Sequence, residues 1–265
     1  MKVGFIGLGN MASAIIGGML KQQIVSAQDV IGADKFAKAA EMAKAKLGIC
    51  ITAENKEVAT QADVLFLAVK PNVLPTVLEE ISGVLRKETI IVSIVAGKSL
   101  AFIAEGLKSD AHKLVRCMPN TPALVLEGCT GVCANDNVSE QEMEQVLTLL
   151  RSFGLAEEVP EKLMDAVVGV SGSSPAYVFM FIEAMADAAV AAGMPRPQAY
   201  RFAAQAVLGS AKMVLETGKH PGELKDMVCS PGGTTIDAVK VLEEKGMRAA
   251  VMSAMEACID KSKRL

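Results

Sequence analysis

Aromatic and histidine residues are scarce in this chain of 265 residues. It has no tryptophan, two tyrosines and two histidines, and aromatic residues make up 4% of the sequence. Proteins that bind single-stranded nucleic acid stack bases on aromatic side chains beside a positively charged groove. The net charge here is −3. The composition therefore excludes such a stacking surface, and we predict that the protein binds no nucleic acid.

Metal-binding spacing is lacking too. The six cysteines form no C-x-x-C pair, and neither histidine lies near them at the spacing of a zinc site. We therefore expect no metal, and we interpret the cysteines as small buried hydrophobic residues. Cys129 and Cys133 could pair in an oxidising compartment. An apolar strand is predicted from residue 3 onward, however, where a signal peptide would need a charged segment, so we expect a cytoplasmic protein.

Long uninterrupted hydrophobic runs are absent although 51% of the residues are hydrophobic. The longest candidate for a membrane span, Ala176–Met194, is interrupted by Glu183 and Asp187. Its length and charges favour a buried core helix over a transmembrane helix. We therefore predict no membrane association.

Apolar runs alternate with helix-length segments in the first part of the chain. This alternation is typical of a parallel sheet that helices cover on both faces. It predicts a doubly wound, Rossmann-like α/β domain over residues 1–160. Strands are expected at Val3–Ile6, Val30–Ala33, Ile49–Ile51, Val64–Val69 and Ile90–Ile94, with a sixth around Leu114 and Val115.

Strand patterns disappear after about residue 160, and the sequence becomes rich in alanine and methionine. We predict an all-helical second domain over residues 161–265. The small and flexible side chains favour close helix packing, within the chain or between subunits. Helices are expected at Ala176–Ala192, Pro197–Leu215, Leu224–Val228, Ile236–Lys245 and Met247–Ser262.

A glycine-rich segment follows the first expected strand directly. Gly7–Ala12 reads G-L-G-N-M-A, which matches the G-x-G-x-x-G/A pattern of dinucleotide-binding proteins. In such a motif Gly7 makes the tight turn, Gly9 lets the pyrophosphate approach, and Ala12 allows close helix packing. A turn without a ligand is the alternative. We predict cofactor contacts from five consecutive residues, Gly7, Leu8, Gly9, Asn10 and Met11.

The end of the second strand carries opposing signals about the cofactor. Asp34 stands where a carboxylate binds the ribose 2′-hydroxyl and favours NADH. Lys35, the next residue, would favour the 2′-phosphate of NADPH instead, and an exposed Asp–Lys pair is also common. The sequence leaves the choice between NAD(H) and NADP(H) open.

Three further segments end strands at the edge where ligands of such sheets bind. Lys70 in the sequence A-V-K-P is predicted near the nicotinamide or the substrate, with a surface lysine as the alternative. Ala96 is small enough to lie against a flat ring. Asn120 stands between two prolines in a rigid loop, which could equally be only a structural turn.

The segment Ser230–Thr235 reads S-P-G-G-T-T and precedes a predicted helix that Gly246 ends. Its glycines allow a close backbone approach, and the free N–H groups at a helix start attract an anion. A capped helix after a tight turn is the alternative. The chain lacks a Ser-His-Asp arrangement, and His112 and His220 have no catalytic context. Reduction of a protonated C=N bond needs mainly orientation, so an imine substrate is favoured.

The sequence resembles the pyrroline-5-carboxylate reductases along nearly its whole length. The resemblance depends on segments already described and on others that composition does not explain. These are Phe5–Met11, Ala68–Pro71, Arg116–Pro122, Gly169–Tyr177, His220–Asp226 and Ser230–Thr235. It implies hydride transfer from NAD(P)H to 1-pyrroline-5-carboxylate, giving L-proline.

The resemblance also implies the roles of individual residues. Cofactor contacts are implied for Gly7–Met11, Asp34, Lys35, Asn55, Ala68, Val69, Lys70, Pro71, Ala96 and Asn120. Substrate contacts are implied for Ser230, Gly233, Thr234, Thr235 and Glu161. Thr235, whose hydroxyl would bond the ring nitrogen, and Lys70 are the predicted catalytic residues. The family further implies a homodimer through the helical domain, with rings of dimers as a larger assembly.

Two positions depart from the family pattern, and two other functions compete. Ser174 replaces a common glycine, and Asp34 replaces small polar or basic residues, which questions a preference for NADPH. A 3-hydroxyacid dehydrogenase would open with a similar glycine motif, but Val178 stands where its catalytic lysine would be. A non-catalytic nicotinamide sensor is disfavoured by the intact loop that contains Thr235.

Overall fold

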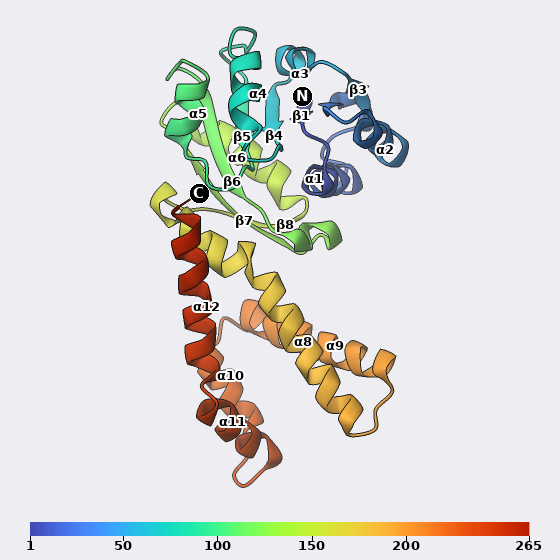
Figure 1. The fold of residues 1–265 in the computed structure, drawn as a ribbon, viewed down its shortest axis with the longest axis vertical. Coiled ribbons are helices and arrows are strands. Elements are labelled where there is room, and N and C mark those ends of the chain that lie inside the picture. The colour runs from blue at the N-terminus through green and yellow to red at the C-terminus, as the bar shows by residue number, and fades with distance from the viewer. Residues whose placement is uncertain (265) are drawn as a thin grey trace. The chain divides into compact units, whose positions relative to one another are not determined.

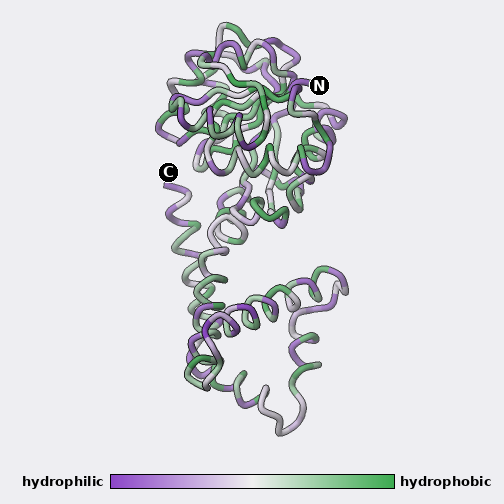
Figure 2. Tube along the Cα trace, turned by 90° about the vertical axis from the view of Figure 1, so that its right-hand side faces the viewer, coloured by the Kyte–Doolittle hydropathy of each residue, from purple (hydrophilic) through white to green (hydrophobic). Residues whose placement is uncertain are grey.

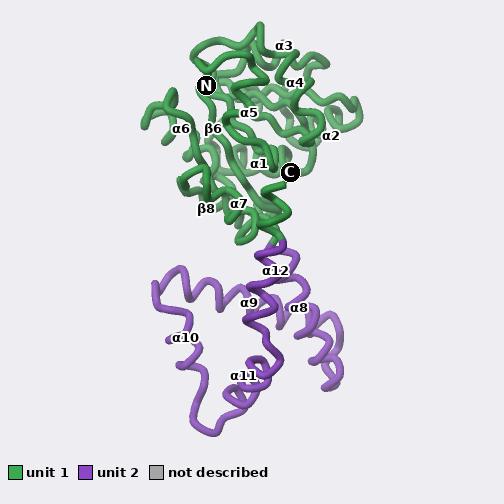
Figure 3. Tube along the Cα trace, turned by 60° about the vertical axis from the view of Figure 1, so that its left-hand side comes forward, with its two compact units in different colours: residues 1–173, 258–265 green, residues 174–257 purple. Residues whose placement is uncertain are grey.

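The computed structural model describes residues 1–264 and divides the chain into two compact units (Figure 3). The first comprises Met1–Ser173 and the C-terminal residues from Cys258 onward, and the second comprises Ser174–Ala257. The first unit extends beyond residue 160 because Met164 is buried in its core. Ser262 donates a hydrogen bond of 2.6 Å to Asp165, which holds the returning C-terminal segment on this unit. The division into a cofactor-binding domain up to residue 160 and a substrate-binding domain after it stays a prediction.

An eight-stranded sheet forms the centre of the first unit (Figure 1). Its order is β3-β2-β1-β4-β5-β6-β7-β8, and the strands from β1 to β6 are parallel. The predicted Rossmann-like, doubly wound fold is confirmed by this order. The strands are β1 (Val3–Ile6), β2 (Val30–Ala33), β3 (Cys50–Thr52), β4 (Val64–Leu67), β5 (Ile90–Ser93), β6 (Lys113–Met118), β7 (Gly128–Ala134) and β8 (Gly154–Glu158).

The last two strands were not predicted, and they make the sheet mixed. β7 runs antiparallel to β6, and β8 runs parallel to β7. Two glycines hide β7 in the sequence because glycine weakens a strand pattern. Both are required by packing: a Cβ atom on Gly131 would lie 2.9 Å from the Val167 side chain, and one on Gly128 would lie 2.8 Å from the Phe153 carbonyl oxygen.

Helices cover both faces of the sheet and create two hydrophobic cores. Because both faces are buried, the central strands read as continuous apolar runs, and Figure 2 shows this hydrophobic trace through the first unit. The Phe5 and Phe66 rings stack at 4.7 Å between β1 and β4. One face is covered by α1 (Asn10–Lys21), α2 (Ala37–Leu47) and α6 (Glu140–Arg151), the other by α3 (Asn55–Gln61), α4 (Leu74–Ile81), α5 (Leu100–Gly106) and α7 (Met164–Val167).

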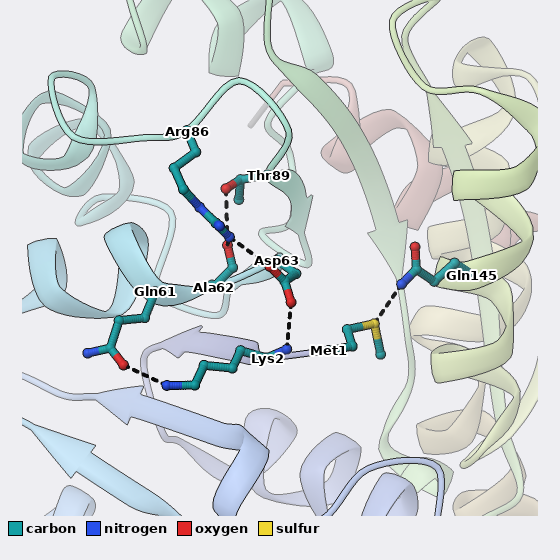
Figure 4. A network of polar contacts seen from close by, with 8 residues as sticks. All are labelled: Met1, Lys2, Gln61, Ala62, Asp63, Arg86, Thr89 and Gln145. Carbon is teal, nitrogen blue, oxygen red and sulfur yellow. Dashed lines mark hydrogen bonds and ion pairs between the residues drawn. The ribbon is translucent and has the colours of Figure 1, made fainter.

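A polar network holds the N-terminal ends of β1 and β4 (Figure 4). Asp63 accepts hydrogen bonds from the Lys2 backbone N–H and from the Arg86 guanidinium, both at 2.8 Å. Arg86 and Thr89 also donate to the Ala62 carbonyl oxygen. The Arg86 contact lowers the pKa of Asp63. This network braces the sheet edge opposite to the one where ligands of such folds bind.

Five helices were predicted after residue 160, and all of them are present. They are α8 (Ser174–Ala191), α9 (Arg196–Thr217), α10 (Pro221–Val228), α11 (Thr234–Glu244) and α12 (Met247–Ser262). Gly246 has a φ of +73° directly after α11, as expected of a helix-ending glycine. The five helices confirm the predicted all-helical C-terminal region.

The expectation that the α8 segment is a buried core helix is wrong for a single chain. Within α8 only Ala186 is buried, while Phe179 and Met180 are exposed. In the described part of the chain, one helical stretch, Glu161–Ala191, is long and apolar enough to cross a membrane. Most apolar side chains of α8 are therefore left uncovered by the other helices of the second unit.

The cysteines are less uniformly buried than expected. All six are free thiols. Cys117 and Cys133 are buried, and burial raises the pKa of Cys133 to about 11. Cys50 is exposed, and the other three are half-buried, so the interpretation as buried hydrophobic residues holds only for the first two.

His112 makes the stability of the first unit depend on pH. Its side chain is buried, Nδ1 has no hydrogen-bond partner among residues 1–264, and burial lowers its pKa from 6.5. The folded protein thus keeps His112 neutral at a pH where the unfolded chain binds a proton. We expect the free energy of unfolding to decrease as the pH falls from 6.5 to 5.5, and less so in His112→Leu. Urea unfolding at several pH values measures this, and equal slopes in both proteins would contradict it.

Candidate active site

The turn after β1 lies against the end of β4, and only glycine fits there. Gly7 has a φ of +95°, and its N–H donates to the Ala33 carbonyl oxygen at 2.8 Å. A Cβ atom on Gly7 would lie 2.5 Å from the carbonyl oxygen of Ala68. The contact brings the ends of β1 and β4 together where the strand order of the sheet reverses. In doubly wound folds, ligands bind at this point.

The start of α1 is open for a phosphate group. Gly9 is the N-cap residue, no side chain caps the helix, and the first turn carries no acidic residue. A Cβ atom on Gly9 would meet nothing within 4 Å, and Gly9 and Asn10 are exposed. Free N–H groups and the helix dipole make such a terminus an anion site. The geometry therefore fits the pyrophosphate of a dinucleotide.

Asp34 joins the end of β2 to the glycine-rich turn. Its carboxylate accepts the Leu8 backbone N–H at 2.7 Å and the Phe36 backbone N–H at 2.8 Å. Lys35 is exposed. A carboxylate has about four acceptor positions, so Asp34 keeps acceptors for a ribose hydroxyl at the predicted place.

The ends of β4 and β5 carry the next predicted residues. Ala68 and Val69 are half-buried, while Lys70 and Pro71 are exposed. Ala96 is half-buried in the loop after β5. Asn55, at the start of α3, donates its side-chain N–H to Glu80 at 2.8 Å. These residues stand at the C-terminal edge of the sheet or at a helix start, and their ligand contacts stay predictions.

Asn120 is buried, and backbone groups surround its amide. Its oxygen accepts the Cys129 N–H at 2.8 Å, and its nitrogen donates to the Ser171 carbonyl oxygen at 3.0 Å. Ser171 belongs to the π-helical turn Val168–Gly172. Asn120 thus links the β6 loop to β7 and to this turn. Its predicted cofactor contact would use the remaining N–H or the second lone pair of the oxygen.

Glu161 is engaged within the first unit. Its Oε1 accepts the Leu100 backbone N–H at 2.8 Å and the Arg116 Nη1 at 3.1 Å. Sequence reasoning assigned Glu161 to the substrate and gave Arg116 no role. A charged residue in the middle of a strand whose neighbours Val115 and Cys117 are apolar was the signal that could have drawn attention to Arg116.

The segment before α11 is a tight turn in the second unit. The Gly233 N–H donates to the Ser230 carbonyl oxygen at 3.0 Å, and Gly232 has a φ of +68°. Proline followed by a left-handed glycine is typical of a type II turn. Gly233 is the N-cap residue of α11, and no side chain caps this helix. Because the Gly233 N–H is used in the turn, the N–H groups of Thr234 and Thr235 are left for an anion.

His220 has a structural role in this region. It is the N-cap residue of α10, and its Nδ1 accepts the Gly222 N–H at 3.1 Å. This confirms its interpretation as a helix-start residue. No group of three or more His, Cys, Asp or Glu side chains that could hold a metal ion occurs within residues 1–264.

Comparison with known proteins decides which family has this arrangement. The chain is 56% identical to the pyrroline-5-carboxylate reductase of Escherichia coli over 265 residues, which cover all of this chain and 98% of that protein. The chain belongs to the pyrroline-5-carboxylate reductase family. A reductase of that name from Methanosarcina acetivorans is 44% identical over all of this chain and 97% of its own length.

Solved structures and family models agree with membership of the pyrroline-5-carboxylate reductase family. The reductase of Coxiella burnetii superposes with a TM-score of 0.92 at 34% identity, over 99% of this chain and 97% of its own. The Plasmodium falciparum enzyme, solved with NADP bound, gives 0.90 at 33% identity, over 100% and 97%. Residues 161–265 match the family described as pyrroline-5-carboxylate reductase dimerisation, and residues 2–97 match NADP oxidoreductase coenzyme F420-dependent.

Proposed function

We propose that the protein reduces the C=N bond of 1-pyrroline-5-carboxylate with NAD(P)H and produces L-proline. Family membership over the full chain supports this activity. The single structural observation that carries it is the uncapped start of α11 behind the Ser230–Gly233 turn, which offers two free N–H groups to a carboxylate. The chemistry of that terminus suits a small anionic substrate.

The first unit would hold the cofactor. The pyrophosphate would lie on the open N-terminus of α1, and the ribose would lie beside Asp34. Bound NAD(P)H supplies the hydride. Ala96 and Lys70 would lie at the nicotinamide end, because the ends of β5 and β4 carry them. The exposed Lys70 ammonium would favour the negative charge of substrate and cofactor there.

The second unit would orient the substrate. The carboxylate would accept the N–H groups of Thr234 and Thr235, and the Thr235 hydroxyl would bond the ring nitrogen. Ser230 would line the same turn. The hydride adds to C5, the C=N electron pair becomes the nitrogen lone pair, and the proton on nitrogen stays, so the protonated imine becomes the amine. Orientation of two bound reactants can supply roughly 7 to 11 kcal/mol of the barrier.

We propose that a second copy of the chain covers the apolar helices. The dimerisation family over residues 161–265 and the exposed Phe179 and Met180 on α8 support a homodimer. Glu183 and Asp187 on the same helix favour a protein partner over lipid. The substrate loop of one subunit would then lie beside the cofactor unit of its partner. A ring of dimers, the absence of nucleic-acid and membrane partners, and a cytoplasmic location stay predictions.

The deciding experiment is cofactor oxidation, followed at 340 nm with 1-pyrroline-5-carboxylate. NADH and NADPH are compared in parallel, and a 3-hydroxy acid with NAD⁺ or NADP⁺ is the control. We expect imine-dependent oxidation and no reaction with the hydroxy acid. Turnover of the hydroxy acid alone would favour the dehydrogenase, and cofactor binding without any turnover would favour a nicotinamide sensor.

A further inference from the structure

A half-buried ion pair lies beside the loop that connects β5 to α5. The side chain of Arg116 on β6 is 12% exposed and that of Glu161 is 35% exposed, and the Arg116 guanidinium contacts Glu161 at 3.1 Å. Glu161 belongs to the short turn before α7 and accepts the Leu100 backbone N–H with the same oxygen. Three segments that are far apart in the sequence therefore meet at one carboxylate.

The Arg116–Glu161 pair connects the two ends of the β5–α5 loop. β5 ends at Ser93, which is the parallel partner of Arg116 in the sheet, and α5 begins at Leu100. The Arg116–Glu161–Leu100 bridge thus closes the base of residues 94–99. Ala96, the residue assigned to the nicotinamide, lies inside this loop.

Other polar contacts also hold the same loop. Val95 N–H donates to the Ser93 hydroxyl at 3.3 Å, and Ser99 caps α5 by accepting the Phe102 N–H at 3.1 Å. Both contacts are local in the chain, whereas the Ile94 N–H at the start of the loop donates to the Leu67 carbonyl oxygen of β4 at 3.1 Å. The Glu161 contact ties the other end of the loop, at Leu100, to a distant element. Loss of Glu161 would leave a largely covered guanidinium and a backbone N–H without this partner, which costs more than the loss of a fully exposed ion pair.

We propose that Arg116 and Glu161 are positioning residues for hydride transfer, and this rests on the proposed function. Their pair holds the β5–α5 loop so that Ala96 supports the nicotinamide ring at the correct distance from the imine. Neither residue touches the reacting atoms. A misplacement of about 1 Å can lower the rate about 100-fold, so a loop anchor of this kind controls catalysis.

The test compares Glu161→Gln and Glu161→Ala. The glutamine amide oxygen can still accept from Leu100 and Arg116, whereas alanine accepts nothing. Glu142→Ala is the matched control, because Glu142 pairs with Lys113 at the other end of β6 at 2.5 Å with similarly covered side chains. For each protein, NADH fluorescence gives the Kd of NADH, competition gives the Kd of ADP-ribose, which lacks nicotinamide, and kinetics give kcat and both KM values.

We expect Glu161→Ala to raise the Kd of NADH about fivefold and to lower kcat at least tenfold, with the Kd of ADP-ribose within twofold of wild type. Glu161→Gln should recover kcat to within about threefold. Glu142→Ala should lower the melting temperature and leave both Kd values unchanged. The binding measurements need no imine, so they test the positioning role even if the proposed reaction fails.

Three results would overturn the proposal. Equal weakening of NADH and ADP-ribose would make Glu161 a general support of the fold. A glutamine variant as defective as the alanine variant in kcat, with an unchanged Kd of NADH in both, would show that Glu161 does not act by holding the loop at the nicotinamide. A rise confined to the KM of the imine would assign Glu161 to the substrate instead.

Discussion

Replacing Thr235 by alanine is expected to lower kcat about 100-fold and to leave the Kd of NADH and NADPH within twofold of wild type. Thr235 is half-buried in the first turn of α11, and its hydroxyl is the group assigned to the ring nitrogen of the imine. The nitrogen of the protonated imine has no lone pair, so its N–H would donate to the Thr235 hydroxyl oxygen. Removing one hydrogen bond that stabilises a transition state typically costs about 10²- to 10³-fold. Steady-state kinetics and cofactor fluorescence measure the two quantities separately.

The control is Thr235→Ser, which keeps the hydroxyl and removes only a methyl group. If the hydroxyl is the group that bonds the imine nitrogen, Thr235→Ser should retain kcat to within about fivefold of wild type. Thr235→Ala keeps the backbone N–H, so the substrate carboxylate can still bind and the KM of the imine should rise less than kcat falls. A parallel loss of cofactor affinity in Thr235→Ala would refute the assigned role.

Replacing Asp34 by serine is expected to shift the cofactor preference toward NADPH at least tenfold. The Asp34 carboxylate lies at the end of β2, and a 2′-phosphate there would meet its negative charge. Wild type should accordingly prefer NADH. The measurement is the ratio of kcat/KM for NADPH to kcat/KM for NADH. Asp34→Ser also removes the carboxylate that accepts the Leu8 N–H, but this loss lowers both kcat/KM values together and leaves their ratio unchanged.

Lys35→Ala distinguishes the two residues at this position. If Lys35 bound a 2′-phosphate, its loss would lower kcat/KM for NADPH alone. We expect little change in Lys35→Ala, because the exposed lysine follows a carboxylate that already favours the free ribose. An unchanged ratio in Asp34→Ser would contradict the predicted contact with the ribose.

Local patterns predicted much of the fold and part of the candidate site. The four central parallel strands β1, β2, β4 and β5 are buried along their whole length, so each one is an apolar run that can be recognised without its neighbours. Gly7 and the Pro231-Gly232 turn are also local, because a left-handed backbone restricts the residue type at that position itself. These features led to the Rossmann-like domain and the helical half, which the structure confirms, and to two helix starts whose anion binding stays a prediction.

Features that depend on residues far apart in the chain could not be predicted in this way. β7 was not predicted because two of its residues are glycines, which the close contacts with Val167 and Phe153 require although glycine does not favour a strand. The contact of Glu161 with Arg116 and Leu100 exists only because the turn before α7 packs on the sheet.

The sequence by itself determined the six parallel strands, the five C-terminal helices and the family that the chain resembles, and it predicted a dinucleotide phosphate site, because each of these depends on residues adjacent in the chain. The tertiary structure alone decided the direction of the last two strands, the partners of Glu161 and the exposure of α8. Those depend on which distant surfaces meet. An apolar helix has the same sequence pattern whether its own chain or another molecule buries it, so the pattern does not distinguish the two cases.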